Sequence, residues 1–138
     1  MAERPRVVVD TNVMISRLLR PPSVPGQAMR RPVDAGTLLV SEATMGELAD
    51  VLARPKFDPY VSIEERQQFL LLLGRIVEMV PILHRIRACR DPSADKFLEV
   101  AVNGEADFLI SGDRDLVELH AFRGIPIVTP AEFLARDA

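Results

Sequence analysis

Four acidic residues stand at places in the chain where they could be gathered into one site. Asp10 ends the apolar run VVVD, and Asp113 comes two residues after the apolar run FLIS. Glu47 and Asp95 lie near the beginnings of segments with helical periodicity. Two unit charges about 4 Å apart repel by roughly 4 kcal/mol at an effective dielectric near 20, so such a cluster needs a shared proton or a bound cation. Oxygen ligands without His or Cys suit Mg²⁺ or Mn²⁺, and the chemistry indicated is metal-assisted phosphodiester hydrolysis.

The elements that would position these acids alternate along the chain. Strand-like runs cover residues 6–10, 37–41, 76–80, 107–111 and 126–130, and helix-like segments cover 41–53, 62–76, 91–103 and 130–138. Ser41, Ser62 and Asp91 are predicted N-caps, and the interrupted stretch 53–62 is predicted to be a loop. The alternation predicts an α/β domain with a mostly parallel sheet covered on both faces. Ligands of such sheets bind beyond the carboxyl ends of the strands, which is where the four acids would lie.

Each acid also has an ordinary structural explanation. Asp10 could cap a helix, and Asp113, beside Gly112, could be a turn residue. Glu47 could be an exposed helix residue, and Asp95 could favour a helix N-terminus through the helix dipole. A single acid therefore says little, whereas four acids in register on an α/β pattern favour a metal site.

Composition sets the class of protein. The chain has 138 residues, 48% hydrophobic and 27% charged, which is typical of one globular domain. The formal net charge is −3, and setting aside the four acids leaves +1, so overall acidity does not exclude a nucleic-acid substrate. We expect a cytoplasmic protein that does not cross a membrane. The chain has a single cysteine, an N-terminus without an apolar targeting segment and no long apolar run.

Three arginines form a second, weaker candidate site. Arg85, Arg87 and Arg90 could contact RNA or could be a solvated connector.

Four stretches together resemble the PIN-domain ribonucleases, in particular the small prokaryotic branch known as toxins of toxin–antitoxin pairs. They are VVVDTNVMISRLL, SEATMGELADVL, CRDPSADKFLEVAVNGEADFLISGDRDL and GIPIVTPAEFL, and they span nearly the whole chain. The resemblance implies one PIN-like domain over residues 1–138, with a five-stranded parallel sheet in a Rossmann-like three-layer sandwich. It also implies a Mg²⁺ or Mn²⁺ site, cleavage of single-stranded RNA, a homodimer and a small antitoxin partner. By position, it places the family's acids and their polar companions at Asp10, Asn12, Glu47, Asp95, Ser111, Asp113 and Asp115.

The leading hypothesis is thus a metal-dependent endoribonuclease. Asp10, Asp95 and Asp113 would bind metal, Glu47 would do so directly or through water, and Asn12 with Ser111 would orient water or phosphate. Asp115 would be a further supporting residue. Replacing Asp95 by Asn is expected to abolish cleavage and to leave the apo fold equally or more stable, because a repulsion is relieved.

Two other functions fit the sequence less well. One is a phosphoaspartyl receiver or phosphatase, which would want a lysine after a later strand; Lys56 and Lys96 are not so placed. The other is a non-catalytic PIN-like module that binds a metal, RNA or a protein. Cleavage assays on a broad RNA panel would separate this module from the nuclease.

Overall fold

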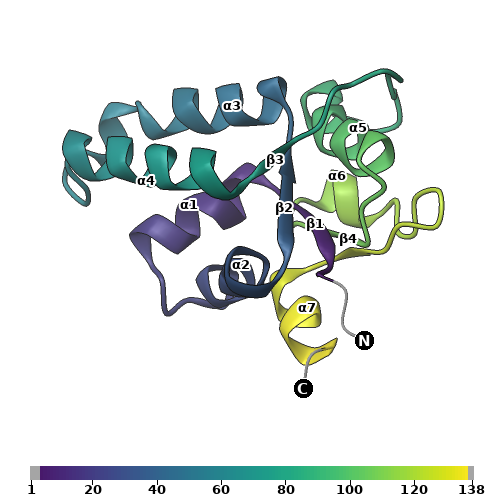
Figure 1. The fold of residues 1–138 in the computed structure, drawn as a ribbon, viewed down its shortest axis with the longest axis horizontal. Helices are drawn as coiled ribbons and strands as arrows, with labels where there is room; N and C mark the ends of the chain where they lie inside the picture. Colours follow the sequence, from purple (N-terminus) through teal and green to yellow (C-terminus); the bar gives the residue numbers. More distant parts are fainter. Residues whose placement is uncertain (1–3, 137–138) are drawn as a thin grey trace.

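The sheet at the centre of the molecule consists of five short parallel strands (Figure 1). The computed structural model describes residues 4–136. The strands are β1 (Arg6–Val9), β2 (Thr37–Val40), β3 (Glu78–Met79), β4 (Phe108–Ile110) and β5 (Ile127–Val128). Their order is β3-β2-β1-β4-β5, so β1 is the central strand. Because every pairing is parallel, the carboxyl ends of all five strands meet at one edge.

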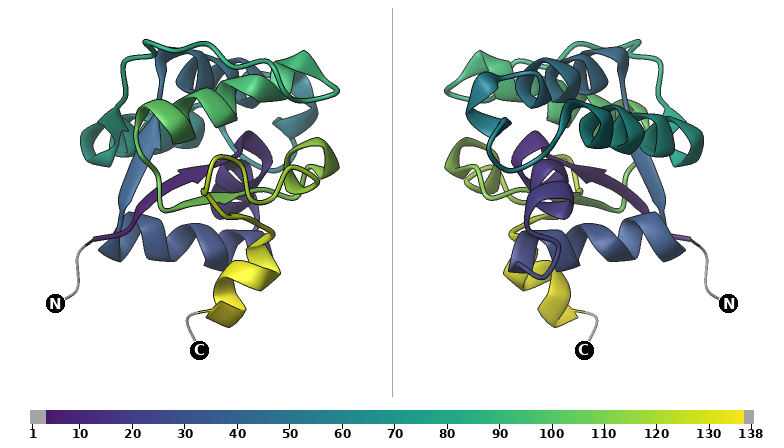
Figure 2. Two further views of the ribbon diagram at one scale, coloured as in Figure 1. Left: turned by 90° about the vertical axis from the view of Figure 1, so that its right-hand side faces the viewer. Right: turned by 90° about the vertical axis from the view of Figure 1, so that its left-hand side faces the viewer.

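Helices cover both faces of this sheet (Figure 1). The α-helices are α1 (Thr11–Leu19), α2 (Val24–Ala35), α3 (Glu42–Leu52), α4 (Ile63–Ile76), α5 (Asp95–Asn103), α6 (Arg114–Val117) and α7 (Pro130–Arg136), and the 3₁₀ turns are η1 (Pro55–Phe57) and η2 (Pro92–Ala94). One face packs against α1, α2, α3, α4 and α7, and the other packs against α5 and α6. The two side views show the same three layers (Figure 2).

Strand β1 shows how the apolar pattern builds these layers. Val7 and Val9 belong to the core under α1 to α4, whereas Val8 belongs to the core under α5. Successive side chains of a strand point to opposite faces, so a run of three valines fills both cores at once. All three are at most 1% exposed. The central strand is therefore fixed from both sides, and the residue that follows it, Asp10, is held in place.

The helix starts that the sequence predicts are present. Ser41 caps α3 and Ser62 caps α4, each as part of a capping box. Asp91 caps the 3₁₀ turn η2, and α5 continues from that turn at Asp95. The terminal helix extends to Arg136, and the last two residues of its predicted range lie outside the described residues.

The fold class and the five strands are confirmed, with shorter strands than the sequence predicts. The largest differences are at β3 and β5, which have two residues each instead of the five predicted at 76–80 and 126–130; α4 continues to Ile76, and α7 begins at Pro130. Helices α1 and α2 fill residues 11–35, for which the sequence analysis specifies no element. In the described part of the chain, none of the helices is both long and apolar enough to cross a membrane.

Candidate active site

Asp10 is a buried carboxylate at the carboxyl end of the central strand. It is 5% exposed and also caps α1, because its Oδ1 accepts a hydrogen bond of 3.0 Å from the backbone N–H of Val13. Its Oδ2 accepts a hydrogen bond from the Ser111 hydroxyl. Burial raises the pKa of Asp10, the hydrogen bonds from Ser111 and Val13 oppose this rise, and the charge of Asp113 adds to it. The fold therefore holds Asp10 in an environment that disfavours its negative charge.

Ser111 and Asp113 reach Asp10 from the neighbouring strand β4. The backbone N–H of Asp10 donates to the carbonyl of Ile110 at 3.1 Å, which brings Ser111 alongside Asp10. Ser111 is completely buried, and its Oγ also accepts a 2.9 Å hydrogen bond from the backbone N–H of Asp113. Asp113 is exposed and caps α6 by accepting from the N–H of Asp115 at 2.9 Å. One serine hydroxyl thus connects the two aspartates that end β1 and β4.

Glu47, on the second turn of α3, has both carboxylate oxygens engaged. The Thr11 hydroxyl donates to Oε2, and the ammonium group of Lys96 donates to Oε1 at 2.7 Å. Both members of the ion pair are only partly exposed, Lys96 at 20% and Glu47 at 29%. The three side chains come from α1, α3 and α5, so this contact joins helices on both sides of the sheet edge.

A single open pocket of about 1060 Å³ holds most of the predicted site residues. Its lining includes Asp10, Asn12, Glu47 and Asp113, and each of these acids and amides was expected there from the sequence. Ser111 lies beneath Asp10 and is buried. The structure therefore brings together three of the four predicted acids, from three separate segments of the chain.

Asp95 is the predicted acid that faces elsewhere. Its Oδ1 accepts hydrogen bonds from the backbone N–H groups of Ala88 at 3.1 Å and Cys89 at 2.8 Å. It lines a second pocket of about 820 Å³, together with Arg85 and Arg87. Burial raises its pKa, but the two backbone hydrogen bonds outweigh burial and hold the pKa below the ordinary range. Its role as a metal ligand stays a prediction, since Asp95 lines the second pocket and not the main one.

The geometry of a helix explains why Asp95 and Lys96 separate. Consecutive helical residues point about 100° apart, so they cannot share a face. Asp95 points toward the loop at 88–89, and Lys96 points across the sheet edge to Glu47. Burial of Cys89 and its contact with Asp95 raise the pKa of the Cys89 thiol to about 12, so this thiol stays protonated and unreactive at neutral pH.

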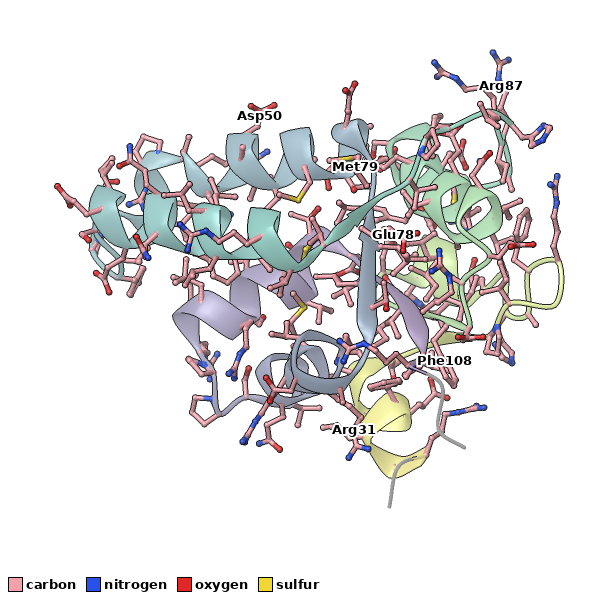
Figure 3. The ribbon with its side chains drawn as sticks, in the orientation of Figure 1. Arg31, Asp50, Glu78, Met79, Arg87 and Phe108 are labelled. Carbon is pink, nitrogen blue, oxygen red and sulfur yellow. The ribbon has the colours of Figure 1, made fainter. Side chains whose placement is uncertain are left out.

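The cations that line the main pocket are not the arginines that the sequence singles out. Arg54, Lys56 and Arg114 line it. Arg87 points outward from its loop (Figure 3), and Arg90 lies 3.6 Å from Glu118 in an exposed ion pair. The sequence shows only that Arg54 and Lys56 directly follow the helix that carries Glu47. Pro55 and Pro59 indicate a loop in this stretch, but they do not predict that the loop lies against the pocket.

The donors of the main pocket fit a hard divalent ion. In residues 4–136, no group of three or more His, Cys, Asp or Glu side chains is arranged to hold a metal ion. Mg²⁺, however, retains several waters and commonly uses one or two protein carboxylates. Asp10 and Asp113 supply two carboxylates whose charges interact, and Asn12 adds a neutral oxygen beside them. This set of oxygen donors suits a hydrated Mg²⁺ or Mn²⁺.

Comparisons with known proteins concern the family and the fold of the chain. A family model described as PIN domain matches residues 6–115. The protein MJ1680 of Methanocaldococcus jannaschii, whose own function is uncharacterized, is 29% identical over 116 residues, which are 83% of this chain and 74% of that protein.

Two solved structures share the fold. VapBC2 from Rickettsia felis, bound to a DNA fragment from its promoter, superposes with a TM-score of 0.60 at 10% identity, over 90% of this chain and 98% of that one. PAE2754 from Pyrobaculum aerophilum superposes with a TM-score of 0.63 at 14% identity, over 96% and 88%. At these identities the similarity concerns the fold alone.

Proposed function

This chain belongs to the PIN-domain family, and we propose that it is an endoribonuclease that uses Mg²⁺ or Mn²⁺ to cleave single-stranded RNA. Membership of the family implies a nuclease in general terms. The observation that carries the finer proposal is Asp10, a buried carboxylate joined through Ser111 to Asp113 at the floor of the main pocket. Burial of Asp10 and repulsion from the exposed carboxylate of Asp113 both disfavour the negative charge of Asp10, and a bound cation would offset this cost.

The roles of the side chains follow from their contacts. Asp10 and Asp113 would hold the metal, which supplies positive charge to activate water and to stabilise the leaving oxygen. Ser111 keeps Asp10 oriented by donating to Oδ2. Glu47, at the pocket wall, would orient water, and the exposed amide of Asn12 can donate to a phosphate oxygen.

The rim of the pocket suits a single-stranded polyanion. In the described residues, Arg54, Lys56 and Arg114 form no ion pair, although all three line a pocket that contains acids. Cations that are free of protein partners can bind backbone phosphates. The ammonium of Lys56 lies 5.1 Å from the ring centroid of Phe57, which lines the same pocket. A cation beside an aromatic ring is the combination that binds unpaired bases by stacking, and a base paired in a duplex cannot use it.

The biological role that we propose is that of a toxin in a toxin–antitoxin pair. The supporting observations are the resemblance in sequence and the shared fold with VapBC2. A small antitoxin would act by obstructing the main pocket. We also propose a homodimer, for which the half-exposed apolar side chains of α4, including Leu71 and Leu72, are candidate contacts. A short neighbouring reading frame that encodes a DNA-binding protein would support the pair, and co-purification with its product would test it.

Cleavage by the full-length chain tests the enzymatic proposal. End-labelled single-stranded RNA should be cut in Mn²⁺ or Mg²⁺ and left intact in EDTA, and a duplex of the same sequence should be cut much more slowly. Replacing Asp10 by Asn should abolish the cleavage. Asp50→Asn is the matched control, because Asp50 is exposed on the outer side of α3 and points away from the pocket (Figure 3).

The same assay distinguishes the non-catalytic alternative. Cleavage in EDTA, or by the Asp10 variant at the wild-type rate, would refute the proposal. If Mn²⁺ raised the melting temperature of the wild-type chain but no RNA in a broad panel were cut, the non-catalytic binding module would be the better description.

A further inference from the structure

Lys96 is a cation that lines the second pocket and reaches across to Glu47, one of the acids that line the main pocket. Its ammonium group lies 2.7 Å from Glu47 Oε1 and also donates to the carbonyl of Ser93. The contact joins α5 to α3, 49 residues apart in the sequence. Because only 20% of the Lys96 side chain is exposed, this contact is screened by water less than a surface ion pair would be.

The charge of Glu47 is therefore already balanced inside the protein. One of its oxygens accepts from Lys96 and the other accepts from the Thr11 hydroxyl. A divalent ion that bound Glu47 directly would have to displace the ammonium or bind beside it, and either step opposes binding because like charges repel.

The other end of the site has the opposite balance. Among the described residues, Asp10 and Asp113 form no ion pair with a cation. Their partners are hydroxyl and backbone N–H groups, from Ser111, Val13 and Asp115. The pocket thus has two carboxylates without a counter-ion at one end and a neutralised carboxylate at the other.

Nucleases that use two metals place the ions about 3.5–4 Å apart, where they stabilise the attacking and the leaving oxygens. We propose that this protein binds one divalent ion, at Asp10 and Asp113, and that the Lys96 ammonium takes the place of a second ion. This inference rests on the proposed metal-dependent activity. Lys96 would supply the positive charge that balances Glu47.

Counting bound Mn²⁺ tests the inference without any reference to catalysis. The full-length chain is titrated with Mn²⁺, and free Mn²⁺ is measured by electron paramagnetic resonance. The wild-type chain should bind one ion. Lys96→Met keeps most of the volume of the stem but removes the charge, so Glu47 is freed and a second Mn²⁺ should bind.

Two further variants act as controls. Lys96→Arg retains the positive charge and should bind one ion, and Lys96→Met combined with Glu47→Gln should also return to one. Circular dichroism establishes that each variant is folded, and Lys96→Gln replaces Lys96→Met if the latter does not fold.

The outcomes separate the inference from the function on which it rests. Two Mn²⁺ ions bound to the wild-type chain would overturn the inference and leave the nuclease proposal intact. An unchanged single ion in both Lys96→Met and Lys96→Gln would also overturn it. No bound Mn²⁺, together with RNA cleavage in EDTA, would overturn the metal-dependent function itself.

Discussion

Replacing Ser111 by Ala removes the hydroxyl that connects the two aspartates of the site. Ser111 is completely buried, and its hydroxyl donates to Asp10 Oδ2 and accepts from the backbone N–H of Asp113. A hydrogen bond to a charged group contributes about 1.5–3 kcal/mol, and the variant leaves a buried carboxylate oxygen short of a donor. We therefore expect the metal-free variant to lose about 2 kcal/mol of unfolding free energy at pH 7, or roughly 8 °C of melting temperature for a domain of this size.

The pH dependence identifies the carboxylate as the cause. The Ser111 hydrogen bond opposes the rise in the pKa of Asp10, so its removal raises that pKa further. Ser111→Ala should therefore lose most stability at pH values above the folded pKa of Asp10, where Asp10 is charged. At low pH, where Asp10 is protonated in both the wild type and the variant, the loss should shrink to about 1 kcal/mol. Urea unfolding in EDTA over a series of pH values from 4 to 9 follows this change in the loss of stability.

Ser93→Ala is the matched control. Ser93 also donates its hydroxyl to an aspartate, Asp91, at 2.8 Å, but that pair is exposed, so its loss should cost less than about 0.5 kcal/mol. Equal effects of the two substitutions, or an effect of Ser111→Ala that does not depend on pH, would refute the reasoning that burial gives this contact its strength.

Three further predictions have a sign that follows from the contacts of the substituted residues. Burial raises the pKa of Asp10, so the contribution of Asp10 to stability is present below its unfolded pKa of about 4 and is lost as the pH rises through its folded pKa. Asp10→Asn in EDTA should therefore be more stable than wild type at pH 7. Urea unfolding should show that this difference vanishes near pH 4. Hydrogen bonds lower the pKa of Asp95, so the contribution of Asp95 to stability is present above about pH 4 and is lost as the pH falls. Asp95→Asn should therefore lose about 1 kcal/mol of unfolding free energy at pH 7, which is opposite in sign to the effect expected from the sequence. A stabilised variant would contradict the observed contacts. Replacing Arg54 and Lys56 by Ala should weaken the binding of single-stranded RNA, measured by fluorescence anisotropy. The slope of log affinity against log salt concentration should decrease in magnitude by about 0.7 for each lost phosphate contact. Arg85→Ala, which lies outside the main pocket, should leave this slope unchanged.

The parts of the fold that the sequence predicts well are those set by local patterns. The apolar runs at 6–10 and 107–111 are short and rich in residues that favour buried strands, and both are present as neighbours in the sheet. Ser41 and Ser62 cap the helices that they were expected to cap, because capping depends only on residues within one turn. The predicted strand 76–80 is shortened to Glu78–Met79, because Ile76 is the last residue of α4 and Val77 is its C-cap.

The proximity of Asp10 and Asp113 could be predicted from the sequence alone. Each follows a buried strand, and the ends of parallel strands share one edge, so no distant contact needs to be known. Glu47 follows from the same rule, because α3 begins one residue after β2.

The directions of the α5 side chains and the identity of the loop that borders the pocket depend on tertiary packing. The rotation of α5 about its axis is set by Phe97 and Leu98, which pack in the core, and that rotation turns Asp95 toward residues 88–89 and Lys96 toward Glu47. Likewise, Arg54 and Lys56 reach the pocket because of where the chain leaves α3. These positions depend on packing between segments far apart in the sequence, and spacing along a single chain does not encode them.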